Sequence, residues 1–315
     1  MITDPQVQAI LAMFASMPVP DLATLKAVDL RAAMGMLTLP SLNEPVAKIS
    51  ELSFAGPGGP VALRLYHPVK DEKLPAIVFF HGGGWVSCSI DTHDNLCRRL
   101  ANRSGCAVIS VDYRLAPEAV FPAALDDACA AVKWVAEHAK ELQIDPLRLA
   151  VAGDSSGGNL AAAYTIVARN PASALPRISH QLLFYPVLDD ACDSPSFTTY
   201  ANGYLLTSSM MRWYWNQYVP SLKDQQDPRA SPAREKNLHG LPSATIITAQ
   251  CDPLCDESAV YAARLKQAGV AVQLNCWPGM FHGFASMLGV LKAADDALDL
   301  AADALRAALS AKPMR

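Results

Sequence analysis

Two adjacent serines lie among glycines in the stretch GDSSGG. A serine nucleophile on a sharp turn between a strand and a helix needs small neighbours two residues to either side, because larger side chains would collide there. Gly153 and Gly157 meet this need for Ser155. For Ser156, one of the two positions is taken by Asp154. The spacing therefore predicts that Ser155 is the nucleophile.

The surroundings of the motif favour chemistry over a plain turn. The apolar run before it, residues 147–152, is typical of a buried strand, and the alanine-rich run after it, residues 156–169, is typical of a helix. A glycine-rich turn without chemistry is the alternative interpretation. A phosphate-binding loop fits less well, because the G-x-x-x-x-G-K-[ST] spacing and its lysine are absent.

A serine hydroxyl needs a base, and the base needs an acid that orients it. On a sheet of this type the order along the chain is serine, acid, histidine. Asp252 directly follows an apolar run that reads as a strand, and His282 is the one histidine after it. These are the predicted acid and base. Asp256 and Glu257 are the alternatives for the acid, although the first turn of a helix stabilises carboxylates for structural reasons alone.

Attack on a carbonyl creates an oxyanion, which needs N–H donors that are already in place. The amide of the residue after the nucleophile, Ser156, is the first predicted donor. The stretch HGGGW follows another apolar run, and its glycines, residues 82–84, can bring bare backbone close to a substrate. A flexible loop without function is the alternative for these glycines.

Eight apolar runs predict strands, and helical patterns separate the later ones. The predicted strands are residues 49–55, 61–66, 76–81, 107–112, 147–152, 180–185, 245–250 and 270–276, and the predicted helices are about 91–104, 123–141, 156–169, 256–268 and 288–311. Strands that alternate with helices predict an α/β fold with a parallel sheet covered on both faces.

Two segments interrupt this alternation and are predicted to form a helical cap over the carboxyl edge of the sheet. The predicted division is residues 1–47 for N-terminal cap helices, 48–187 and 241–315 for the catalytic body, and 188–240 for a cap insert, which is too long for a simple loop. Within the first segment, one helical face carries Val7, Ile10, Leu11 and Phe14. The predicted lining of a substrate pocket is Leu205, Leu206, Met210, Trp213, Leu254 and Phe281.

The composition argues against several classes of function. A net charge of −4 over 315 residues gives no electrostatic basis for binding nucleic acid, and the apolar runs are too short to insert into a membrane. The eight cysteines form no C-x-x-C pair and no H-E-x-x-H motif is present, so we expect reduced thiols and no metal. A start that lacks a basic stretch and carries Asp4 predicts no signal peptide and a cytoplasmic protein.

In these motifs the chain resembles the hormone-sensitive-lipase-like (family IV) carboxylesterases of the α/β-hydrolase superfamily. The matching stretches occur in family order: HGGGW (81–85), VDYRLAPE (111–118), FPAALDD (121–127), GDSSGGNLA (153–161), DPLCDE (252–257) and HGF (282–284). The resemblance implies the α/β-hydrolase fold, with a mostly parallel eight-stranded sheet and a helical cap. It also implies cofactor-free hydrolysis of short- to medium-chain acyl esters through an acyl-enzyme intermediate, by a monomer or homodimer.

Carried over by position, the resemblance makes Ser155, Asp252 and His282 a catalytic triad. It places the oxyanion hole at the amides of Gly83, Gly84 and Ser156. The chain departs from the family at Ser156, where alanine is usual, and the backbone role expected there leaves catalysis intact. His81 and Arg114 match family motifs and are interpreted as residues that brace loops. An amide, lactone or peptide hydrolase with the same residues remains an alternative, as does a non-catalytic receptor on the same fold.

Overall fold

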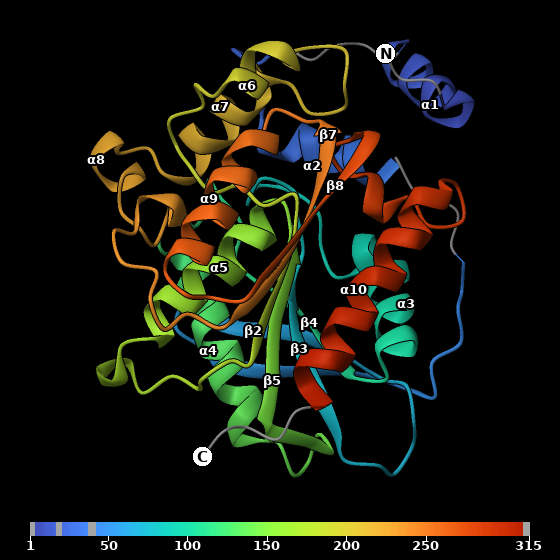
Figure 1. Cartoon of the computed structure of the whole chain (residues 1–315), viewed down its shortest axis with the longest axis vertical. Coiled ribbons are helices and arrows are strands. Elements are labelled where there is room, and N and C mark those ends of the chain that lie inside the picture. The colour runs from blue at the N-terminus through green and yellow to red at the C-terminus, as the bar shows by residue number, and fades with distance from the viewer. Residues whose placement is uncertain (1–3, 17–20, 37–41, 311–315) are drawn as a thin grey trace.

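The computed structural model describes residues 4–16, 21–36 and 42–310 of the chain. An eight-stranded sheet forms its centre, in the order β1-β2-β4-β3-β5-β6-β7-β8 (Figure 1). The strands are β1 (Lys48–Gly56), β2 (Gly59–His67), β3 (Leu74–Phe80), β4 (Ala107–Asp112), β5 (Ile144–Asp154), β6 (His180–Phe184), β7 (Ser243–Cys251) and β8 (Val272–Phe281). The pairs β1–β2 and β2–β4 are antiparallel and the others are parallel, which confirms the predicted mostly parallel sheet.

Helices cover both faces of this sheet (Figure 1). Neighbouring residues of a strand point to opposite faces. Accordingly, Phe79 of β3 belongs to the buried cluster under α3 and α10, and Phe80 to the cluster under α4, α5 and α9. These helices are α3 (Asp94–Ser104), α10 (Lys292–Ser310), α4 (Ala123–Glu137), α5 (Ser156–Ala168) and α9 (Cys255–Gln267).

Shorter helices surround the end of the sheet at which the parallel strands finish (Figure 1). They are α1 (Pro5–Ala15), α2 (Ala27–Met36), α6 (Pro195–Thr199), α7 (Ser208–Tyr218) and α8 (Leu222–Gln225), with 3-10 turns η1 (Asp91–His93), η2 (Pro171–Ser173), η3 (Pro232–Arg234) and η4 (Phe284–Ser286) elsewhere. The predicted face of α1 is recovered, since Val7 is buried and its three partners are partly buried. Parts of the predicted segment 1–47 lie outside the described residues, and the division into body and cap stays a prediction.

Several predicted boundaries are wrong by three or more residues. Helix α4 ends at Glu137 instead of 141, and strand β5 begins at Ile144 instead of 147. Strand β8 continues to Phe281 instead of ending at Cys276, because a bulge in its pairing with β7 accommodates the Pro-Gly pair that reads as a strand end. Helix α10 begins at Lys292 instead of about 288, because Gly289, at φ +73°, belongs to a turn. The last predicted residue of that helix, 311, lies outside the described residues. In the part of the chain that is described, no helix has the length and apolarity needed to cross a membrane.

The buried His180 at the start of β6 makes the stability of the fold depend on pH. Its Nδ1 lies 2.8 Å from Ser243 Oγ, and its Nε2 lies 3.1 Å from Thr245 Oγ1, both on β7. Burial lowers the pKa of His180 to about 4 from an ordinary value of 6.5. Below pH 6.5 the folded protein therefore binds fewer protons than the unfolded chain, and stability falls with pH.

We expect His180 to remove about 3 kcal/mol from the free energy of unfolding as the pH falls from about 6.5 to about 4. Urea unfolding at several pH values measures this loss. The variant His180→Gln cannot take up the proton and should lose less stability over the same range. An equal loss in wild type and variant would contradict the assignment.

Candidate active site

The turn between β5 and α5 holds Ser155 in a strained backbone conformation. Its φ is 54° and its ψ is −118°, outside the regions that non-glycine residues ordinarily occupy. The chain around it fixes this geometry: the Ser155 amide donates to Phe184 O at 2.9 Å, and its carbonyl accepts from the amides of Asn159 and Val187. The strain points the side chain of Ser155 away from the sheet at the carboxyl end of β5.

The two glycines that flank the turn are required by close backbone contacts. A Cβ on Gly153 would stand 2.3 Å from the backbone of Gly157, and a Cβ on Gly157 would stand 1.9 Å from Phe80 O. Backbone atoms of a sheet cannot move away from such contacts without distorting their neighbours. The steric reason that the spacing suggested is therefore the one found in the structure.

Ser155, His282 and Asp252 form a continuous chain of hydrogen bonds. Ser155 Oγ lies 2.9 Å from His282 Nε2, and His282 Nδ1 lies 2.7 Å from Asp252 Oδ2. The other oxygen of Asp252 accepts from the Leu254 amide at 2.9 Å. Because an ionised carboxylate can only accept, Nδ1 carries the proton of the imidazole, and Nε2 is left to accept from the serine hydroxyl. The three side chains come from the ends of β5, β7 and β8, which the parallel sheet brings to one edge.

The alternative acids make contacts elsewhere. Asp256 Oδ2 accepts from the Ser196 amide at 2.8 Å, and Glu257 Oε1 accepts from the Leu188 amide at 2.7 Å. Burial raises the pKa of Glu257 well above its ordinary value. Both carboxyl groups tie the segment after β6 to the start of α9, and neither is hydrogen bonded to His282.

Tyr185, which the sequence did not single out, supports the imidazole. The centroid of its ring lies 4.8 Å from that of His282 and 6.0 Å from that of Phe284. Its amide donates to Ile247 O, and its φ of +33° is unusual for a tyrosine. No spacing or motif in the sequence marks this residue, because its role depends on how β6 and the loop after β8 lie together.

The glycine loop after β3 is folded back on itself. Gly83 has a φ of +112° and Gly84 a φ of +62°, conformations that favour glycine. The carbonyl of Gly83 accepts from the amides of Val86 and Ser87 and from Ser87 Oγ at 2.9 to 3.1 Å. Among the residues that the structure describes, no hydrogen bond is donated by the amides of Gly83 and Gly84.

Aromatic side chains of α7 cover this loop. A Cβ on Gly84 would stand 2.2 Å from Cδ1 of Tyr214, so the tyrosine ring lies directly on the glycine backbone. Trp85 stacks on Tyr218 with ring centroids 4.3 Å apart, and its ring lies 5.0 Å from that of Trp215. The predicted pocket lining left out Tyr214, although this ring lies against the glycine loop.

The predicted pocket residues divide into two groups. Leu205 lies beside the histidine loop, 3.5 Å from the place of a Cβ on Gly283. Leu206 and Trp213 are buried with Tyr214 in one apolar cluster, and Met210 packs against the same cluster.

Leu254 and Phe281 require a correction. Both were predicted to line the pocket, but each has 0% of its surface exposed. A side chain without exposed surface offers none to a ligand in this conformation. Leu254 belongs to the apolar cluster under α4, α5 and α9, and Phe281 belongs to the cluster under α3 and α10.

The remaining motif residues brace the site from behind. Burial lowers the pKa of His81 to about 3, so its imidazole is neutral, and its Nδ1 donates to Gly82 O at 2.8 Å. Arg114 forms two hydrogen bonds of 2.8 Å with the buried Asp127. The hydroxyl of Ser156 is fully buried beside that of Tyr113, so it cannot contact a substrate.

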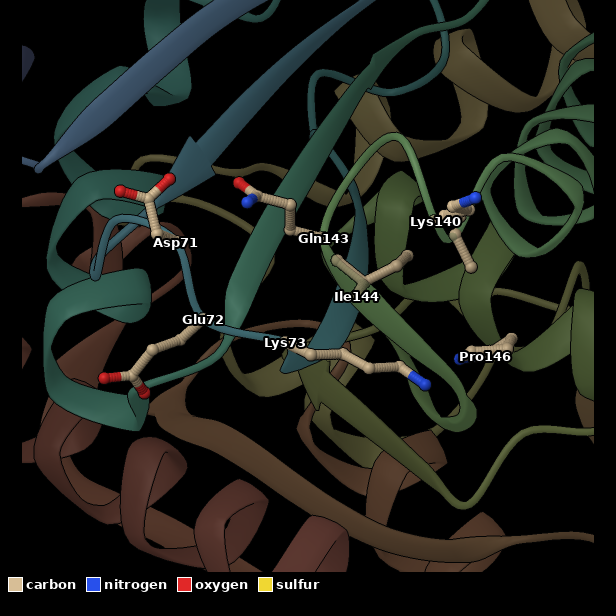
Figure 2. A pocket seen from close by; sticks show the side chains of 8 residues that line it. Asp71, Glu72, Lys73, Lys140, Gln143, Ile144 and Pro146 are labelled. Carbon is tan, nitrogen blue, oxygen red and sulfur yellow. The ribbon is translucent and has the colours of Figure 1, made fainter.

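Two surface clefts lie away from Ser155. One opens at the starts of β3 and β5, opposite the strand ends that carry the serine, and Asp71, Lys73 and Lys140 line it (Figure 2). The other is lined by Glu257 and by residues of the segment after β6. In the described ranges, no group of three or more His, Cys, Asp or Glu side chains is arranged to bind a metal ion.

Comparison with known proteins gives one family. The family model described as the α/β hydrolase fold matches residues 77–286. An ethyl acetate hydrolase of Pseudomonas putida is 43% identical over 266 residues, 82% of this chain and 82% of that protein. The carboxylesterase NlhH of Mycobacterium tuberculosis is 40% identical over 287 residues, 89% of each chain. The solved structure of a hyperthermophilic esterase from the archaeon Pyrobaculum calidifontis has a TM-score of 0.92 and 38% identity, over 98% of this chain and 99% of that one.

The variant Gly157→Ala tests the steric requirement of the turn. We expect a loss of about 1–3 kcal/mol in stability and of most activity toward a small ester, because the new Cβ must displace Phe80 O or the serine itself. Urea unfolding and a rate assay measure the two effects. The matched control is Gly105→Ala, at φ +67° with no atom within 4 Å, which should cost about 1–2 kcal/mol and keep full activity. Full activity in Gly157→Ala would contradict the requirement.

Proposed function

The chain belongs to the α/β-hydrolase family and is a serine hydrolase of carboxylic esters, and from that premise we propose how its residues carry out the reaction. Ser155 is the nucleophile, His282 is the base, and Asp252 orients the base. The observation that carries this proposal is the unbroken hydrogen-bond path from Ser155 Oγ through both nitrogens of His282 to the carboxylate.

The first half of the reaction forms an acyl-enzyme. Nε2 of His282 takes the proton of the serine hydroxyl while Oγ bonds to the carbonyl carbon of the ester. The carbonyl oxygen becomes an oxyanion, and the amides of Gly83, Gly84 and Ser156 donate to it. The tetrahedral species then collapses, and the imidazolium gives its proton to the departing alcohol oxygen. The acyl group stays on Ser155.

The second half of the reaction repeats these steps with water. His282 takes a proton from a water molecule, whose oxygen bonds to the acyl carbon, and the same amides stabilise the second oxyanion. Collapse releases the carboxylic acid and returns the proton to Ser155 Oγ. Asp252 remains ionised throughout and stabilises the imidazolium that forms in each half. No step requires a metal or another cofactor.

A helical cap is part of the proposal. The insert 188–240 contributes the aromatic residues that lie on the glycine loop, and the N-terminal segment is tied to the same region by Arg31 of α2. Nε of Arg31 donates to Val86 O at 2.7 Å, and its Nη2 donates to Ala116 O at 2.9 Å. Because both segments contact the glycine loop or the residues next to it, we propose that they enclose an acyl chain.

The proposed substrates are small and apolar. A relative named for the hydrolysis of ethyl acetate supports a short acyl group, and the leucines and aromatic rings of the insert supply apolar surface. The eight cysteines are free thiols, which suits a cytoplasmic protein in a reducing compartment.

Alanine at each of the two serines tests which one reacts. Ser155→Ala removes the nucleophile, and we expect kcat to fall by about 10⁶-fold. Ser156→Ala keeps the backbone amide and removes only a buried hydroxyl, so most activity should remain. Hydrolysis of p-nitrophenyl butyrate measures both. High activity in Ser155→Ala together with loss in Ser156→Ala would refute the assignment.

The acyl-chain preference tests the cap. Each methylene that enters an apolar pocket contributes about 0.8 kcal/mol, so KM should fall by roughly fourfold per methylene from acetyl esters upward, until the chain outgrows the enclosed space. Rates on a series of p-nitrophenyl esters measure the profile.

A truncated protein without residues 1–35 provides the comparison for this profile. Removing α1 and most of α2, with Arg31, should open the pocket and weaken the chain-length selectivity. Circular dichroism confirms that the shortened protein is folded. A flat profile in the intact protein, or an identical profile after truncation, would refute the proposed role of the cap.

A further inference from the structure

The residue before the nucleophile, Asp154, makes contacts that the reaction above does not use. Its Oδ1 accepts a hydrogen bond from the Gly82 amide at 2.8 Å and lies 3.0 Å from His93 Nε2. Asp154 is 5% exposed and His93 is 6% exposed, so water hardly reaches the pair. One carboxylate oxygen at the end of β5 thus joins the glycine loop after β3, 72 positions earlier in the chain, and the turn η1 that follows that loop.

The hydrogen bonds around His93 determine its charge. The Gly82 nitrogen lies 3.4 Å from Nε2, but this amide donates to Asp154 over a shorter distance, 2.8 Å. The carboxylate lies 3.0 Å from Nε2 and only accepts, so this nitrogen carries a proton. Nδ1 lies 2.9 Å from Thr92 Oγ1, whose own proton goes to Ser89 O at 2.8 Å, so Nδ1 donates as well. An imidazole with two donors is a cation. Burial opposes this charge, but the charge and hydrogen bond of Asp154 outweigh burial and raise the pKa of His93 above its ordinary value.

We propose that His93 is a positioning residue for the ester hydrolysis. Through the Asp154 carboxylate it fixes the Gly82 amide, and a fixed Gly82 sets the direction in which the next two amides of the loop point. The contact is tight, since a Cβ on Gly82 would stand 2.4 Å from Asp154 Oδ2. The inference rests on the proposed function, because those next two amides are the proposed oxyanion donors.

Positioning of this kind has a measurable value. Oxyanion donors stabilise the transition state only if they already point at the developing charge, and removal of one donor costs about 10²–10³-fold in kcat. A glycine loop that is not held by Asp154 keeps its N–H donors, but these donors point at the oxyanion for a smaller fraction of the time. We therefore expect a smaller loss, about tenfold to a hundredfold in kcat, with little change in KM.

Two substitutions of His93 test the inference. His93→Leu removes the donor, and kcat for p-nitrophenyl butyrate should fall within the range given above while KM changes by less than about twofold. His93→Gln places an amide nitrogen near the position of Nε2 and should restore most of kcat. Rates are divided by the concentration of active sites, titrated with an organophosphonate, so a misfolded fraction does not lower the measured kcat. An alkyl trifluoromethyl ketone, whose adduct carries an oxyanion, should bind His93→Leu more weakly by the same factor as kcat.

A control separates positioning from stability. His180→Leu removes another buried histidine, at the start of β6 and away from the site, and should lower the melting temperature without changing kcat per active site.

The variant His93→Leu leaves Asp154 buried without its partner and could prevent folding. In that case, variants of the exposed Thr92 test the same inference. Thr92→Val removes the acceptor of His93 Nδ1 and should lower kcat, whereas Thr92→Ser keeps the hydroxyl and should not.

The inference is overturned by unchanged kcat in His93→Leu, by equal loss in His93→Leu and His93→Gln, or, in the fallback, by unchanged kcat in Thr92→Val. These failures differ from failure of the proposed function. That function fails if Ser155→Ala remains active, whatever the variants of His93 do.

Discussion

The site depends on one strained residue. Ser155 occupies φ 54° and ψ −118°, and such a conformation persists only where its surroundings enforce it. The enforcement is steric on one side, through Gly153 and Gly157, whose missing side chains let α5 start against the end of β3. It is electrostatic on the other side, through hydrogen bonds of the Ser155 backbone with the last residue of β6, with the segment after β6 and with the first turn of α5. The strain lifts the hydroxyl clear of the sheet, where a base can reach it.

The parallel sheet supplies the rest of the arrangement. Parallel strands all finish at the same edge, so residues that follow β5, β7 and β8 meet although 127 positions separate the serine from the histidine. The acid directly follows β7, whose central residues are buried, and the base directly follows the two buried residues that end β8. This burial limits the freedom of both side chains before substrate binds. The carboxylates of Asp256 and Glu257 accept hydrogen bonds from amides of the segment after β6, so Asp252 is the one of the three that bonds to the imidazole.

The loop that faces the nucleophile is organised from both sides. Tyr214 and the stacked rings around Trp85 cover its outer side, and the Asp154–His93 pair lies beneath its start. A glycine backbone is otherwise free to adopt many conformations, so contacts on both sides reduce the entropy that it would lose when an oxyanion forms. Chain segments far apart in sequence thus cooperate in orienting a few amides.

The sequence by itself determined the features that depend on near neighbours. The spacing of glycines around Ser155 reflects a steric need that is satisfied within five residues, and the run of a strand followed by Asp252 or His282 is equally local. Alternation of strands and helices was enough to predict a parallel sheet covered on both faces, and the resemblance to a family implied that its pairing is mostly parallel. Only the tertiary structure decided that Leu254 and Phe281 are covered, that β8 runs on through a bulge, and that Tyr185, Tyr214 and His93 reach the site. These outcomes depend on which elements pack against each other, and a contact between distant residues leaves no periodic trace in either segment.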